Sequence, residues 1–131
     1  MMRIFRIISV LAVFLYLTPS AFAADCSSAG DAISIAECHE QRYIKADREL
    51  NAVYKEAMKS LPENEKQKLQ TAQRAWLKYR DASFQFVFEQ NKESGSFGGI
   101  AISSYKASVV EKRVLELKYL LSGPEAPPVK W

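Results

Sequence analysis

The chain has 131 residues, of which 48% are hydrophobic and 25% charged, and its formal net charge is +3. This length and composition predict one globular domain with a modest core. Two of its 18 basic residues, Arg3 and Arg6, lie in an N-terminal leader without acidic residues, so the rest of the chain is close to +1. A nearly neutral protein gives no bulk electrostatic argument for binding nucleic acid or an anionic membrane.

The N-terminal stretch has the three parts of an export signal. MMRIFR is positively charged, IISVLAVFLYL is a short apolar run, and an Ala-x-Ala site ends at Ala23. We expect a signal peptide at 1–23 and a periplasmic or secreted protein with no stable membrane anchor after cleavage. An uncleaved anchor is the alternative, but the apolar run is short for a membrane span. Asp25, directly before Cys26, argues against a lipid-modified cysteine.

Both cysteines, Cys26 and Cys38, lie in the mature part of the chain. Because an exported compartment is oxidising, we expect them to form one disulfide. It would close a loop of about a dozen residues and stabilise the fold by on the order of 3 kcal/mol in the chain-entropy model. The alternative is a pair of thiols at a metal site, but Cys38-His39-Glu40 lacks the ligand spacing of such sites. We therefore expect no metal or other cofactor.

Apolar residues recur at helical spacing over about residues 30–60, which predicts a first helix. A turn at 61–64 follows, where Ser60 and Glu63 fit a capping box and Pro62 fits a first helical turn. The second predicted helix runs from this turn to about Asn91. Its predicted core face consists of Leu69, Ala72, Trp76, Tyr79, Ser83 and Val87.

The segment SGSFGGIAISS, residues 94–104, is rich in glycine and serine and has no charge, so it predicts a flexible loop. A third helix is expected from about Ser104 to Leu121, stopped by Gly123. Residues 123–131 are expected to form an extended tail. We therefore predict an all-α domain at 24–122, in which two long helices form an antiparallel hairpin and a third packs across it.

Arg80 falls among the apolar residues of the second predicted helix. In a hairpin that turns near residue 62, facing residue numbers sum to about 124 to 127, so Asp47 faces Arg80. A buried unpaired guanidinium would cost several kcal/mol, and its planar fork suits one carboxylate. We expect the two to form a structural ion pair that sets the register of the helices. The alternative is that Arg80 is an exposed contact for a partner. Arg113 invites the same two interpretations, with a carboxylate of the first helix as its candidate partner.

No catalytic group of residues is recognisable in the sequence. His39 is the only histidine, and no serine or cysteine nucleophile lies beside it in a known motif. Glu37 and Glu40 are one helical turn apart, but nothing places them in an apolar cleft that would raise their pKa values. Trp76 is more typical of a core anchor than of a sugar-stacking platform. We therefore expect a protein that is not an enzyme.

Several segments, in this order, resemble the LprI-like lysozyme inhibitor family, an exported bacterial domain long catalogued as being of unknown function. The spacing of the two cysteines matches the first cysteine pair of the family. RYIKADRELNAVY at 42–54 and AQRAWLKYRDA at 72–82 resemble its two most specific blocks, and Arg-x-x-Glu-Leu at 113–117 completes the order. The resemblance covers nearly all of the mature chain up to about Leu121.

One feature departs from this resemblance. Members of the family usually carry two further cysteines, but this chain has Phe84 at one of those places and residues such as Tyr105 or Ser108 at the other. Their joint absence implies that they normally pair with each other and that Cys26 pairs with Cys38 here. Aromatic packing by Phe84 is then expected in place of the missing bridge, with a looser loop at 94–104.

The resemblance implies a non-enzymatic envelope protein that inhibits a lysozyme-type muramidase by protein–protein binding. Such an inhibitor must block a cleft that holds two catalytic carboxylates. A strongly basic lysozyme would favour an acidic partner, and the near-neutral charge of the mature chain does not supply one in bulk. The alternative is a helical binding or assembly module of the cell envelope with a different protein partner. The candidate contact residues are those of the predicted loop: Ser96, Phe97, Ser103 and Ser104.

Overall fold

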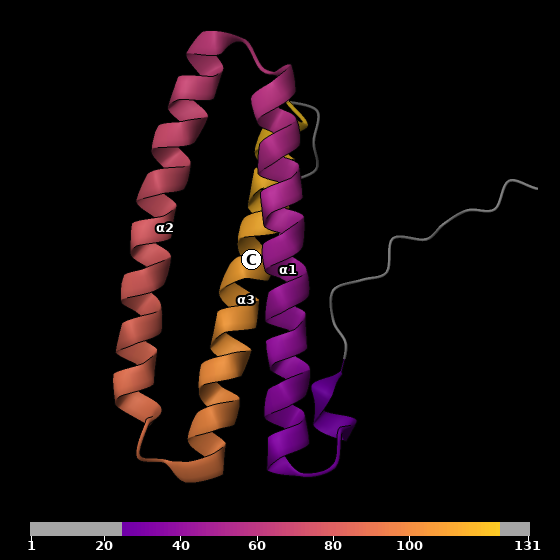
Figure 1. The fold of residues 1–131 in the computed structure, drawn as a ribbon, viewed down its shortest axis with the longest axis vertical. Helices are drawn as coiled ribbons and strands as arrows, with labels where there is room; N and C mark the ends of the chain where they lie inside the picture. The colour runs from indigo at the N-terminus through magenta and orange to yellow at the C-terminus, as the bar shows by residue number, and fades with distance from the viewer. Residues whose placement is uncertain (1–24, 124–131) are drawn as a thin grey trace, which may run out of the picture.

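The computed structural model describes residues 25–123, and within this range every regular element is helical (Figure 1). A short 3₁₀ helix, η1 (Cys26–Ser28), precedes three long helices, α1 (Ala32–Ser60), α2 (Glu63–Asn91) and α3 (Gly95–Leu121). The predicted all-α arrangement of three helices is confirmed. The predicted signal peptide at 1–23 and the tail beyond Gly123 lie outside the described residues. None of the helices described is both long and apolar enough to span a membrane.

The three helices run up, down and up, so that α1 and α3 are parallel and α2 is antiparallel to both (Figure 1). α3 packs extensively along α1 and also against α2, whereas the backbones of α1 and α2 approach each other closely at few points. The antiparallel order of the hairpin is therefore as predicted, but α3 supplies most of the packing that holds it. The main cluster of buried core residues comes from α1 and α3: Ala46, Leu50, Val110, Val114 and Leu117.

A side-chain cap explains where α1 begins, whereas α2 begins without one. The Asp31 carboxylate accepts hydrogen bonds from the backbone N–H groups of Ile33 and Ser34 at 2.9 and 3.0 Å, which is a strong N-cap for α1. The capping box predicted for α2 is not formed. Ser60 is still the last residue of α1, where its hydroxyl donates to the carbonyl oxygen of Glu56 at 3.1 Å, and the N-cap position of α2 is occupied by Pro62, which has no side-chain hydrogen bond to offer.

The predicted flexible loop at 94–104 is wrong, because α3 already begins at Gly95. Gly95 has a φ of +60°, a left-handed conformation that glycine adopts without strain, and it turns the chain from α2 into α3. All four candidate contact residues are therefore helical: Ser96, Phe97, Ser103 and Ser104.

The helical start of α3 depends on a close approach to the end of α2. A Cβ added at Gly98 would lie 2.1 Å from the carbonyl oxygen of Asn91, so only glycine fits there. The Ser103 hydroxyl is satisfied within the helix, where it donates to the carbonyl oxygen of Gly99 at 2.9 Å. Tertiary packing thus outweighs the low helix propensity of the glycines, about 1 kcal/mol each relative to alanine.

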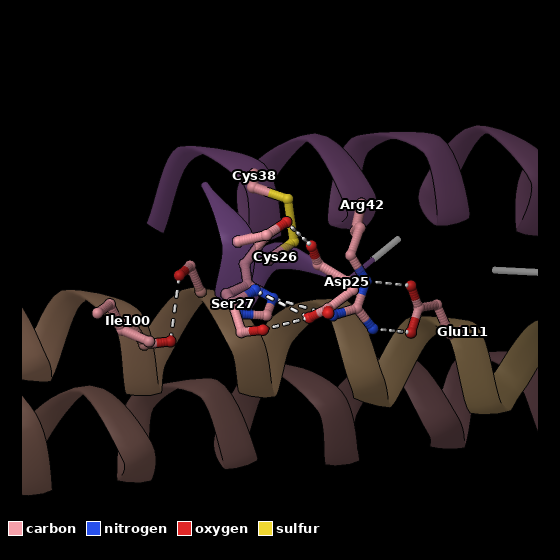
Figure 2. Close-up of a disulfide and its surroundings, with 10 residues drawn as sticks. Asp25, Cys26, Ser27, Cys38, Arg42, Ile100 and Glu111 are labelled. Atoms are coloured by element: carbon pink, nitrogen blue, oxygen red, sulfur yellow. Dashed lines mark hydrogen bonds and ion pairs between the residues drawn. A yellow bond between two sulfur atoms is a disulfide. The ribbon is translucent and has the colours of Figure 1, made fainter. Parts of the chain in front are cut away.

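The predicted disulfide between Cys26 and Cys38 is confirmed. It holds η1 beside the first turns of α1 (Figure 2), and Cys26 is 3% exposed. The carboxylate of Asp25 caps η1 by accepting a hydrogen bond from the backbone N–H of Ser27 at 3.0 Å. The bridge therefore fixes the N-terminal segment at the end of the bundle where α2 turns into α3.

Candidate partner-binding surface

The near-neutral charge of the chain is unevenly distributed over the molecule. Because α1 and α3 are parallel, the start of α1, the end of α2 and the start of α3 lie at one end of the bundle (Figure 1). We call residues 25–43 and 82–108 the acidic end, since acidic residues outnumber basic ones there, while basic residues outnumber acidic ones in the rest of the described chain. The acidic end carries Asp25, Asp31, Glu37, Glu40, Glu89 and Glu93 against Arg42, Lys92 and Lys106.

Large apolar side chains are exposed at the same end of the molecule. Phe97 is 78% exposed, Ile33 70%, Phe86 65% and Phe88 46%, and they come from all three helices. Single exposed apolar residues are normal, but several aromatic side chains at one end of so small a domain are typical of a binding surface. Of the four candidate contact residues, Ser96 and Phe97 are exposed, Ser104 is partly buried, and Ser103 is buried at 7% exposure.

A hollow of about 350 Å³ opens at the acidic end, and all three helices line it. Phe88 and Ile102 form apolar walls, and the carboxylates of Glu37 and Glu40 lie at its side. Glu40 is neutralised by Lys106, whose Nζ lies 3.0 Å from the carboxylate, whereas Glu37 is exposed. The hollow can therefore hold an apolar stem beside a negative charge.

A partly buried ion pair joins α1 to α3 beside the disulfide (Figure 2). Arg42 donates from Nε and Nη2 to the two carboxylate oxygens of Glu111 at 3.0 and 2.6 Å, and its Nη1 lies 2.9 Å from Nδ1 of His39. Burial, together with the positive charge of Arg42, lowers the pKa of His39 below 6.5. Because arginine can only donate, Nδ1 accepts and His39 is neutral. His39 therefore helps to orient a structural pair.

The structure places Arg80 and Asp47 side by side, with 3.9 Å between Nη1 and Oδ1. The expected fork onto Asp47 is not formed, because Nε and Nη2 donate instead to Oδ1 of the neighbouring Asp81 at 2.8 and 2.7 Å. The guanidinium also lies over the rings of Trp76 and Phe84, 5.5 and 5.8 Å from their centroids. The role of the Asp47–Arg80 pair in setting helix register stays a prediction.

Arg113 is 6% exposed, and its partners are not those expected from the first helix. Its Nε and Nη2 donate to Oε1 of Gln73 on α2 at 3.1 and 2.9 Å, and its Nη1 donates to Glu116 at 2.8 Å. Sequence reasoning missed Gln73. The sequence does hint at a buried polar contact, because the Gln73 amide lies between Leu69 and Trp76 on the apolar face of the second helix.

Phe84 connects all three helices through edge-to-face aromatic contacts. Its ring centroid lies 6.0 Å from that of Tyr43 on α1 and 6.3 Å from that of Tyr105 on α3. Such pairs contribute about 0.5–1.5 kcal/mol each beyond the area they bury. This packing supports the substitution of an aromatic cluster for a second disulfide.

No group of three or more His, Cys, Asp or Glu side chains that could hold a metal ion occurs within residues 25–123. The fold and surface thus define a small, disulfide-linked helical protein with an acidic, aromatic end suited to a protein partner. The chain belongs to the family described as lysozyme inhibitor LprI, whose family model matches residues 23–117. This confirms the resemblance found in the sequence.

The chain also has a curated relative. It is 30% identical over 115 residues to an uncharacterised protein of Rhizobium meliloti (strain 1021), and the match covers 77% of this chain and 81% of that protein. No solved structure matches the chain.

Proposed function

We propose that the mature protein is exported to the periplasm or secreted, and that it inhibits a lysozyme-type muramidase by binding rather than by catalysis. Membership of a family described as lysozyme inhibitors supports the proposed partner. The sequence of residues 1–23 supports export. The observation that carries the proposal is the acidic end, where exposed aromatic side chains and excess carboxylates occur together.

Electrostatics favour this end as the contact surface for a basic enzyme. Opposite charges on two partners increase the rate of encounter and orient the docking. The excess of carboxylates lies at one end only, so a basic lysozyme would be drawn to that end although the whole chain is nearly neutral. The near-neutral total charge is therefore no obstacle to the proposed partner.

Phe97 is the side chain best placed to insert into a partner. It is 78% exposed, and it lies in the first turn of α3, next to the close contact between Gly98 and Asn91. A rigid helical turn loses less conformational entropy on binding than the flexible loop expected from the sequence. Aromatic residues are also enriched among the contacts that dominate binding energy.

The hollow at the acidic end suits a basic side chain of the partner. A lysine or arginine stem would lie along Phe88 and Ile102, and its charged head would reach Glu37. This arrangement would give the contact a specific polar anchor next to an aromatic one.

The proposal is tested by adding the purified mature protein to c-type and g-type lysozymes and following lysis of bacterial cell walls. We expect excess protein to slow at least one lysozyme. Phe97→Ala and Glu37→Lys should each weaken inhibition about tenfold or more without lowering the unfolding midpoint. Unchanged lysis rates with every lysozyme would refute the proposal.

Two matched variants locate the surface. Tyr79→Ala removes an aromatic side chain that is 60% exposed but lies outside the acidic end. Glu65→Lys reverses an exposed charge in the first turn of α2, at the opposite end. Both should inhibit like the unmodified protein. If they lose as much inhibition as Phe97→Ala and Glu37→Lys, the acidic end is not the binding surface.

A second candidate function is a binding or assembly module with another envelope protein. It is favoured by a separate group of exposed apolar residues on the C-terminal half of α3, where Leu120 is 58%, Leu115 45% and Tyr119 38% exposed. Inhibition that survives all changes at the acidic end but is lost with Leu120→Ser would support a role for this region instead.

A further inference from the structure

We infer that the groove between α1 and α2 is a binding site for the C-terminal residue of a peptide, with Arg80 and Arg74 receiving its carboxylate. The groove encloses about 260 Å³ and lies outside the acidic end, so this inference is independent of the proposed function. Its polar lining comes from both helices: Asp47, Asn51, Gln70, Gln73, Arg74 and Arg80.

The groove is polar where a helix bundle is normally apolar. Facing positions on neighbouring helices of a bundle usually carry aliphatic side chains. Here Gln73 is only 7% exposed, and the side chain of Arg80 is 19% exposed. Burying polar groups is unfavourable unless they are satisfied, and departures from the apolar pattern tend to mark functional positions.

Arg80 is held in place but retains an unused donor. Asp81 takes its Nε and Nη2, and the rings of Trp76 and Phe84 hold the guanidinium plane. Nη1 points toward Asp47 at 3.9 Å, which is too long for a hydrogen bond. The guanidinium is therefore oriented in advance, with one edge available to an occupant of the groove.

Gln73 adds a second oriented donor. Because arginine has no acceptor, the two hydrogen bonds from Arg113 must go to the amide oxygen of Gln73. The side-chain NH₂ group is then the part of Gln73 that can donate into the groove. Arg74 completes the donor set from an exposed position, and no carboxylate in the described part of the chain pairs with it.

This set of groups selects a particular kind of ligand. Two guanidinium groups and an amide NH₂ favour a planar carboxylate. Oδ2 of Asp47 accepts from Asn51 at 3.2 Å, and its Oδ1, which lies 3.9 Å from Nη1 of Arg80 without a hydrogen bond, would accept the N–H that precedes a peptide's terminal carboxylate. Leu50 and Leu77 offer an apolar wall for a small side chain. The volume is below the roughly 300–1,000 Å³ of typical ligand pockets, so it suits one or two terminal residues.

The test is a titration of the ¹⁵N-labelled mature protein, followed by NMR, with N-acetyl-L-alanyl-L-alanine and with its D,D form. The first stands for the C-terminus of a protein and the second for a cell-wall peptide. We expect saturable shifts of the Arg80 Nε–H and the Gln73 side-chain NH₂ with at least one of them. The corresponding C-terminal amide should bind about tenfold or more weakly, because it lacks the charge.

Two single-charge variants provide the control. Arg74→Gln removes a rim donor from an exposed position and should weaken binding about fivefold or more. Lys78→Gln removes the same charge from an exposed residue of α2 that does not line the groove, and it should bind within about twofold of the unmodified protein.

Four results would each overturn the inference. The first is the absence of saturable shifts with both peptides. The second is equal affinity for the C-terminal amide. The third is equal affinity for inorganic sulfate, which indicates an unselective anion site. The fourth is an equal loss of affinity in Lys78→Gln and Arg74→Gln.

Discussion

The buried guanidinium of Arg113 makes a quantitative prediction about what holds α2 to α3. Replacing Gln73 with leucine keeps a side chain of similar size at this position but removes the one oxygen within residues 25–123 that accepts from Nε and Nη2 of Arg113. Glu116, on the same helix as Arg113, retains its hydrogen bond to Nη1. Because Arg113 is 6% exposed, water has little access to the two donors left without a partner.

The expected loss of stability follows from these contacts. A hydrogen bond to a charged group contributes about 1.5–3 kcal/mol, and the two lost here share one acceptor atom. We therefore expect Gln73→Leu to lower the free energy of unfolding by about 3 kcal/mol. For a domain of this size that corresponds to a drop in Tm of roughly 12–24 °C.

A double variant separates an unsatisfied charge from a loss of packing. Arg113→Met together with Gln73→Leu removes both the charge and its partner. The free energy of unfolding of this double variant should therefore be within about 1 kcal/mol of that of the unmodified protein. Guanidinium unfolding followed by circular dichroism at 222 nm measures all the variants in one double-mutant cycle. The reasoning is refuted if Gln73→Leu changes stability by less than about 0.5 kcal/mol, or if the double variant loses as much as the two single variants together.

Two further predictions concern α3 and the pH dependence of stability. Gly98→Ala should destabilise the fold by about 2 kcal/mol, because the added Cβ would clash with Asn91. At Gly99 an added Cβ would meet nothing within 4 Å, so Gly99→Ala should stabilise the fold by up to about 1 kcal/mol. Equal effects of the two variants in chemical unfolding would contradict the close approach of Gly98 to Asn91. The lowered pKa of His39 means that the unfolded chain takes up a proton first, so stability falls as the pH drops through 6.5. His39→Gln, which keeps an acceptor for Arg42, should flatten that dependence between about pH 7 and about pH 5, and an unchanged slope would refute it.

Much of this protein follows from local pattern in the sequence. The 3.6-residue spacing of apolar side chains predicts the long helices, and two cysteines that follow an expected export signal predict one bridge. The register of the hairpin follows from its short turn, and this register predicts that Asp47 on the first helix faces Arg80 on the second. These features depend on residues that are close together in the chain or on the length of a turn, and both can be read directly from the sequence.

What the tertiary structure decided depends on residues far apart in the chain. α3 begins at Gly95 rather than near Ser104, because Gly98 packs against the carbonyl of Asn91. This tertiary contact outweighs the low helix propensity of the glycines. The partner of Arg113 is Gln73, 40 positions away. The acidic end exists only because the up-down-up order brings three helix ends together, so that charges nearly balanced along the chain are separated in space. Helical periodicity is a local property of the sequence, whereas contacts and surface charge depend on how the helices are arranged.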